Sequence, residues 1–240
     1  DCTVSVYQGP GLTPAGAIDL GGMPHGLRSA AGGSIIVVAN MADRLDLIDP
    51  TTDRLTGTVP VGKAPVQVAV TADGRFAYSS ITDPPSVLKV DLVSRTVVGS
   101  VPVPTAPVQL YLTPDEKTLV SANQGTSDKP GDTISVIDAA AMTVRGTVGT
   151  GSGPHGVVID ETGTRAWVTN TFDGTVSAVD LDNLTALATI PVGKRPNGIS
   201  YSPKPPTAPA AATVALDLPA VPSQHPHDNS EHGPGSGHGH

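Results

Sequence analysis

Cysteine, aromatic residues and long apolar runs are all scarce in this sequence of 240 residues. Cys2 is the single cysteine, so no disulfide can form within the chain, and cysteine content does not identify the redox compartment. Aromatic residues make up only 3%, so the core must be built mainly from Val, Leu, Ile and Ala. No apolar run approaches the ~18 residues that a membrane span requires. We therefore expect no membrane span.

Positive charge is also sparse. The formal net charge is −8, and Lys194-Arg195 is the only adjacent basic pair. Nucleic-acid binding needs a basic surface that neutralises phosphates, so no nucleic-acid partner is expected. The chain begins with Asp1 rather than Met, which suggests a processed form or a fragment of a longer protein.

Glycine and proline are abundant, and they punctuate an internal repeat. Each repeat begins at a proline, and the spacings between successive starts are 41, 42, 47 and 42 residues. The starts are Pro24, Pro65, Pro107, Pro154 and Pro196. The longer spacing contains an insertion over 124–133, which we expect to be a loop.

Each unit has four short runs of alternating β-branched residues, separated by Gly, Asp, Asn and Pro. This pattern predicts four strands joined by turns. Four strands in about 42 residues is the size of a propeller blade. The sequence therefore predicts an all-β fold, a β-propeller of four-stranded blades. A right-handed β-solenoid is the second choice, since its coils are shorter.

The two ends of the repeat region are complementary. Residues 3–20 match the last two strands of a unit, 197–202 match the first, and 212–218 could supply the second. We therefore expect five blades, the last closed by N- and C-terminal strands, which would remove open sheet edges. The predicted domains are a propeller over 1–203, which could extend to 218, and a disordered tail over 219–240.

The repeats resemble the YVTN-type β-propeller family. Trp167-Val168-Thr169-Asn170 is similar to the signature of that family, and the segments at 37–40 and 120–123 are weaker copies. PVGK at 60–63 and PVGKRPNG at 191–198 are similar to its linker between blades. The resemblance implies a propeller in a surface-layer, periplasmic or secreted protein. Relatives of the fold include enzymes, so the resemblance leaves the activity open.

One repeat position carries polar side chains that could meet at the mouth of a central channel. His25, His155 and Asn197 each follow the linker proline, and Gln67 and Gln109 lie one residue further along two other units. These five residues are the predicted ligand-binding set. A Pro-His-Gly turn that merely starts the innermost strand is the alternative, and isolated histidines are common without being ligands.

No catalytic residues are predicted. The aspartates that end the third strand recur in every unit, which indicates a structural role in accepting backbone N–H groups of the following turn. They are Asp49, Asp91, Asp138 and Asp180. No Ser-His-Asp order, G-x-S-x-G elbow or cysteine-based metal spacing is present.

The C-terminal tail has a different composition, rich in His, Gly and Pro. Five histidines that could bind Cu²⁺, Zn²⁺ or Ni²⁺ fall there: His225, His227, His232, His238 and His240. An inert solvated tail is the alternative, and no cofactor is required by any other motif.

Three functions follow from these patterns. The first is an extracytoplasmic binding or scaffold protein without a catalytic site, whose partner is a protein or a small molecule. The second is periplasmic metal handling through the tail. The third is a propeller-type enzyme, such as a lactonase or an oxidoreductase.

Overall fold

The computed structural model describes residues 2–204, which lie in one compact unit, Asp1–Pro205. Its regular structure is almost entirely β-strand, with one short 3-10 helix, η1 (Ala31–Gly33). Among these described residues, no helix has the length and apolar character needed to cross a bilayer. The all-β prediction is confirmed.

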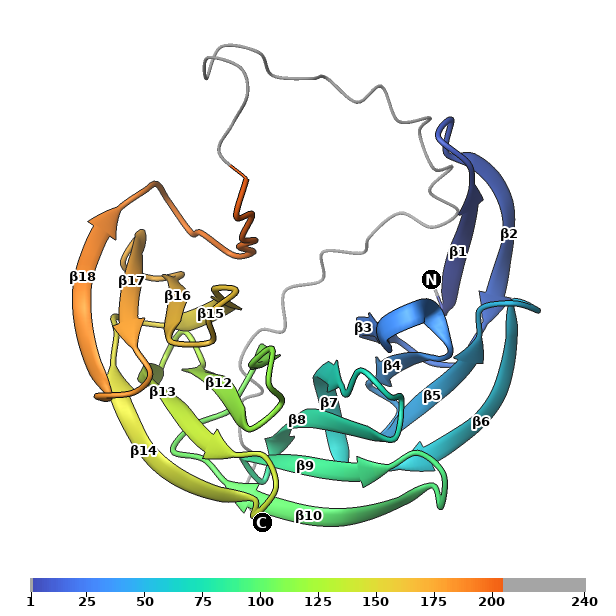
Figure 1. Ribbon diagram of the computed structural model, residues 1–240, viewed down its shortest axis with the longest axis horizontal. Helices are drawn as coiled ribbons and strands as arrows, with labels where there is room; N and C mark the ends of the chain where they lie inside the picture. Colours follow the sequence, from blue (N-terminus) through green and yellow to red (C-terminus); the bar gives the residue numbers. More distant parts are fainter. Residues whose placement is uncertain (1, 205–240) are drawn as a thin grey trace, which may run out of the picture. The chain divides into compact units, whose positions relative to one another are not determined.

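Four four-stranded antiparallel sheets follow one another along the chain, and we call them blades 1 to 4 (Figure 1). Blade 1 consists of β3 (Pro24–Ser29), β4 (Ile36–Asn40), β5 (Arg44–Asp49) and β6 (Arg54–Pro60). Blade 2 consists of β7 (Lys63–Val70), β8 (Phe76–Asp83), β9 (Ser86–Asp91) and β10 (Thr96–Pro102). Blade 3 consists of β11 (Leu110–Leu112), β12 (Thr118–Gly125), β13 (Pro130–Asp138) and β14 (Thr143–Gly149). Blade 4 consists of β15 (Pro154–Ile159), β16 (Arg165–Asn170), β17 (Thr175–Asp180) and β18 (Thr185–Pro191).

Strands are hydrogen-bonded in chain order within every blade, so each blade is a meander with its first strand at one edge and its fourth at the other. The first strands β3, β7, β11 and β15 contact one another from blade to blade. We call them the inner strands. Figure 1 shows the fourth strands β6, β10, β14 and β18 along the opposite, outer edge.

The core lies between the blades, because neighbouring sheets pack face to face. One apolar cluster joins blades 1 and 2, a second joins blades 2 and 3, and a third joins blades 3 and 4. The side chains are almost all aliphatic, as the scarcity of aromatic residues requires. Burial of this apolar surface is the main stabilising contribution to such a stack.

The N-terminal segment forms half a blade. Strands β1 (Thr3–Gln8) and β2 (Thr13–Asp19) pair as an antiparallel hairpin, as expected for the last two strands of a unit. Ile18 and Leu20 are buried against Val38 and Ile48 of blade 1. The half-blade therefore covers the free face of blade 1.

The expected closure of a fifth blade is not formed in the described part of the chain. β1 pairs only with β2, and residues 197–202 have no strand conformation. The remaining expected strand, over 212–218, lies outside the described residues. The structure thus contains four complete blades and one half-blade.

The insertion in the third unit is a hairpin rather than a loop. β13 is longer than the third strand of any other blade, and it stays paired with β12 as far as Gly125↔Pro130. A tight turn follows, in which the Thr126 amide donates to the Lys129 carbonyl at 3.0 Å. Most of the added residues are therefore absorbed into the ladder.

Buried asparagines lie at or near the end of the second strand in three blades. Asn123 and Asn170 have no exposed surface, and each donates through Nδ2 to a serine hydroxyl on the third strand, Ser135 or Ser177, at 2.9 Å. Asn40 occupies the same place in blade 1. These amides satisfy buried hydroxyls, so the asparagine of the resembled motif has a structural role here.

Candidate functional site

Four of the five predicted ligand-binding residues lie at the inner strands, near the point where the chain enters them, and Asn197 lies in the segment without strand conformation that follows β18. Glycines there allow neighbouring parts of the chain to approach closely. A Cβ at Gly26 would overlap the Gln67 side chain and come within 2.6 Å of the Val66 carbonyl oxygen. A Cβ at Gly156 would overlap the Asn197 carbonyl oxygen. The glycine after each histidine is therefore required by packing between blades.

The two glutamines use their side-chain oxygens to hold strand entries in place. Gln109 Oε1 accepts from the Val157 amide at 2.9 Å, which links blade 3 to blade 4. Gln67 Oε1 accepts from the Val68 amide at 3.0 Å. Both side chains are only half-buried. Since each carbonyl oxygen is engaged, the amide NH₂ groups are the parts of these side chains available to a ligand.

His25 also has a structural contact. Its Nδ1 lies 2.9 Å from the Val66 carbonyl oxygen, so Nδ1–H donates and the neutral ring leaves Nε2 as an acceptor. The side chain is exposed at the surface. This bond joins the entry of β3 to that of β7, as the alternative interpretation of the Pro-His-Gly turn requires, while one ring nitrogen remains free.

His155 differs from His25 in its surroundings. Its Nδ1 is buried and has no hydrogen-bond partner among the described residues. Burial lowers the pKa of His155, a hydrogen bond between the ring and the Asn197 backbone acts in the opposite direction, and the charge of His25 lowers the pKa further. The imidazole is therefore held in its neutral form, and it lies within electrostatic reach of His25.

Hydroxyl groups on two second strands complete this region, and they were not predicted from the sequence. Thr169 Oγ1 accepts from the Gly156 amide at 2.7 Å and donates to the Asn197 carbonyl at 2.8 Å. Ser80 Oγ donates to the Val108 carbonyl at 2.8 Å. The signal that could have found them is their shared repeat position, two residues after an aromatic side chain in each case.

The arrangement contains no ready-made metal centre. Within residues 2–204, no group of three or more His, Cys, Asp or Glu side chains lies close enough together to hold a metal ion. The five tail histidines lie outside the described residues, and so does their predicted metal binding. The inner-strand entries instead offer neutral donors and acceptors, which suit a small polar ligand.

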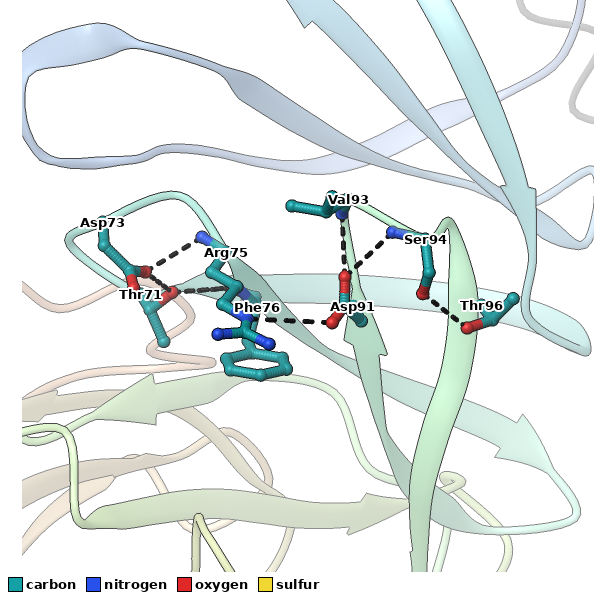
Figure 2. A network of polar contacts seen from close by, with 8 residues as sticks. All are labelled: Thr71, Asp73, Arg75, Phe76, Asp91, Val93, Ser94 and Thr96. Carbon is teal, nitrogen blue, oxygen red and sulfur yellow. Dashed lines mark hydrogen bonds and ion pairs between the residues drawn. The ribbon is translucent and has the colours of Figure 1, made fainter.

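The recurring aspartates have the structural role that their repetition predicts. Asp91 accepts from the Val93 amide at 2.9 Å and the Ser94 amide at 3.0 Å, and Arg75 Nε lies 3.8 Å away (Figure 2). Hydrogen bonds from Ser94 are the main reason that the pKa of Asp91 is lowered. Amides of the following turn lower the pKa of Asp180 in the same way. The prediction of turn-capping carboxylates is confirmed.

Comparison with solved structures supports the propeller fold. Hydrazine synthase of Kuenenia stuttgartiensis is similar over 71% of this chain and 49% of its own, with 25% identity and a TM-score of 0.67. A protein of unknown function from Desulfotomaculum acetoxidans is similar over 84% of this chain and 66% of its own, with 16% identity and a TM-score of 0.73. The chain thus spans less than two thirds of the length of either protein.

No protein-family model matches the chain, so the YVTN resemblance is not confirmed at the family level. No curated protein matches it either. The comparisons therefore support a fold of four-stranded blades that is similar to parts of two larger proteins.

Proposed function

We propose that this chain is an extracytoplasmic binding protein that holds a small polar ligand at the entries of its inner strands. The observation that carries the proposal is the state of His155, whose Nδ1 is buried without a protein partner. A buried polar atom normally has a partner, and one without a protein partner is a position for a ligand atom or an ordered water. The Asn197 backbone contacts the same ring, and the charge of His25 acts on it from within electrostatic reach.

The proposed function does not include catalysis, because the side chains at the inner-strand entries are neutral hydrogen-bond donors and acceptors. Catalytic sites are usually marked by paired titratable groups with opposed shifts in pKa. The enzyme alternative rests on the similarity to hydrazine synthase, at 25% identity over part of each chain. Function resides in sites rather than folds, so this similarity alone does not favour catalysis.

Substitution of the two histidines separates a binding role from a structural one. His25→Ala removes the bond to the Val66 carbonyl and should lower the free energy of unfolding by about 1 kcal/mol, the usual net value of such a bond. His155→Ala removes a nitrogen without a partner and should cost less than His25→Ala. Chemical denaturation of both variants measures the difference. A larger loss from His155→Ala would show that the ring is structural.

Ligand binding is tested with imidazole resonances. In a 1–220 form that lacks the tail histidines, ring signals of His25 and His155 can be assigned from the single alanine variants. Zn²⁺ is a suitable first probe because neutral imidazole nitrogens bind it. We expect both rings to respond together at one saturable site. Independent or absent responses to Zn²⁺ and to small polar metabolites would contradict a shared site.

A further inference from the structure

Lys89 places a charge where the other blades have an apolar core residue. Its partner across the ladder is Gly99 of the fourth strand, and the residues that pair in the same way in blades 1, 3 and 4 are Leu47, Val136 and Ala178. Those three are 1%, 0% and 5% exposed. Lys89 itself is half-buried. Lysine is rarely placed at positions of this kind unless its ammonium has partners.

The ammonium of Lys89 is held by two aromatic rings and one carbonyl of blade 3. Its Nζ lies 4.5 Å from the ring centre of Phe76 and 5.5 Å from that of Tyr78. It donates to the Ala139 carbonyl at 2.9 Å, and that oxygen also accepts from the Tyr78 hydroxyl at 3.0 Å. Burial is the main cause that raises the pKa of Tyr78 to about 12, so the phenol stays neutral. Cation–π contacts of this kind stabilise a partly desolvated cation.

No carboxylate neutralises Lys89 among residues 2–204, since it takes part in none of their ion pairs. An ammonium has three N–H groups, and only one of them has a protein acceptor here. Asp91 lines the same region, but its carboxylate is already bound by two backbone amides and lies 3.8 Å from Arg75 (Figure 2). Glu116, Asp138 and Asp73 act on the neighbouring Tyr78 through their charges. Lys89 therefore has carboxylates within electrostatic reach, but no described carboxylate is in contact with its ammonium.

A cavity opens beside this ammonium between blades 2 and 3. Its volume is about 470 Å³, within the range of small-molecule sites. Lys89 and Ser100 contribute polar groups to its wall, and Val98, Ala141 and Met142 contribute apolar ones. An anion could bind the free N–H groups of Lys89 while an apolar chain lies along the other side.

We propose that the cavity between blades 2 and 3 binds a small organic monocarboxylate, with Lys89 as the residue that recognises the carboxylate. The ligand completes the hydrogen bonds of the ammonium and forms with it the ion pair that no carboxylate of residues 2–204 forms. Its apolar part covers Val98 and Met142, both of which face the cavity. This site is separate from the inner-strand entries, so it stands or fails independently of the proposed function.

Octanoate titrated into the full chain tests the proposal, with binding followed by calorimetry and by saturation-transfer NMR. We expect one saturable site below the concentration at which octanoate forms micelles. Lys89→Leu, which copies Leu47 of blade 1, should weaken binding at least about tenfold, since hydrogen bonds to charged groups are the strong ones. Octan-1-ol should bind more weakly than octanoate, because it lacks the charge.

Two further variants test whether octanoate binds in this cavity. Ala141→Trp leaves Lys89 intact but fills the cavity from an exposed position, and it should also weaken octanoate binding. Lys194→Leu removes an exposed lysine outside the cavity and should leave binding unchanged. Circular dichroism confirms that each variant is folded. Equal binding by wild type and Lys89→Leu, equal binding of octan-1-ol, or no saturable binding of octanoate would overturn the proposal.

Discussion

At the residue scale, the half-buried imidazole of His155 links stability to pH. Its pKa is lowered in the folded protein relative to an ordinary value of 6.5. The unfolded chain therefore takes up a proton at a higher pH than the folded chain does. Stability should be fully present above about pH 6.5 and should fall as the pH drops below that value.

His155→Val, which copies the valine at the same position in blades 2 and 3, removes this group. The variant should lose less stability between pH 7 and pH 5 than wild type does, because one protonation that favours unfolding is gone. Urea denaturation at several pH values measures the slope. Parallel slopes for the two proteins would contradict a depressed pKa at His155.

A buried asparagine, Asn123, is a second residue whose replacement should change the free energy of unfolding by a predictable amount. Asn123→Ala leaves the Ser135 hydroxyl without its 2.9 Å donor in a region that has no solvent contact. The free energy of unfolding should fall by about 1–3 kcal/mol, the cost of an unsatisfied buried group. Thermal and chemical denaturation both measure this loss.

Blade 2 supplies the matched control for that prediction. It carries Ile81 and Leu88 at the places that Asn123 and Ser135 hold in blade 3, and both are buried. The double change Asn123→Ile with Ser135→Leu should therefore recover part of the stability lost in Asn123→Ala. A double variant no more stable than the single one would mean that the polar pair is required for the fold of blade 3.

At the scale of the strand, close approach between blades makes one glycine irreplaceable. A Cβ at Gly156 on β15 would overlap the Asn197 carbonyl, which is backbone and cannot rotate away. Gly156→Ala should destabilise the protein by about 1–3 kcal/mol, as overpacking usually does. Gly149→Ala is the control, since no atom lies within 4 Å of a Cβ there. Similar losses in both variants would contradict the packing argument.

The strands themselves were largely predictable, because alternation and turn residues are local signals. The four blades and the half-blade at 3–20 match the sequence prediction in number and place. The closure was not predictable in this way. Strand conformation at 197–202 requires a partner strand, and the alternating pattern there cannot show whether that partner is in place.

The site was predictable only in part. The repeat position of the two histidines marks the inner-strand entries, but nothing in the sequence tells that His25 donates to a carbonyl while the His155 Nδ1 has no partner. Lys89 lies in a run, SVLKVD, that alternates like an ordinary strand. Its unusual position emerges only when the ladders of the four blades are compared.

At the scale of the whole molecule, the half-blade protects blade 1. Ile18 and Leu20 bury Val38 and Ile48, so deletion of residues 1–20 would expose these apolar side chains and the face of a sheet. We expect the shortened protein to be less stable and to aggregate, which light scattering during heating would detect. A shortened form that stays monomeric with an unchanged melting temperature would show that the half-blade is dispensable.

The tail prediction also belongs to this scale. Five histidines within residues 225–240 should bind Cu²⁺ or Zn²⁺, because clustered imidazoles are good ligands for both. Titration of the full chain and of a 1–220 form should show sites that disappear with the tail. Equal metal binding by the two forms would exclude this role.

The order of the blades is constrained by what each junction contains. The fourth strands of blades 1, 2 and 3 each contain a glycine on which a side chain of the following blade packs. That side chain differs from junction to junction: Arg95 packs on Gly57, Met142 on Gly99 and Leu184 on Gly146. Blade 2 adds Lys89, which donates to the Ala139 carbonyl of blade 3. Repeated units could in principle be shuffled, since each meets only its neighbours. Here the side chains that pack across each junction differ, so a transplanted or duplicated blade would meet side chains that do not match its own face.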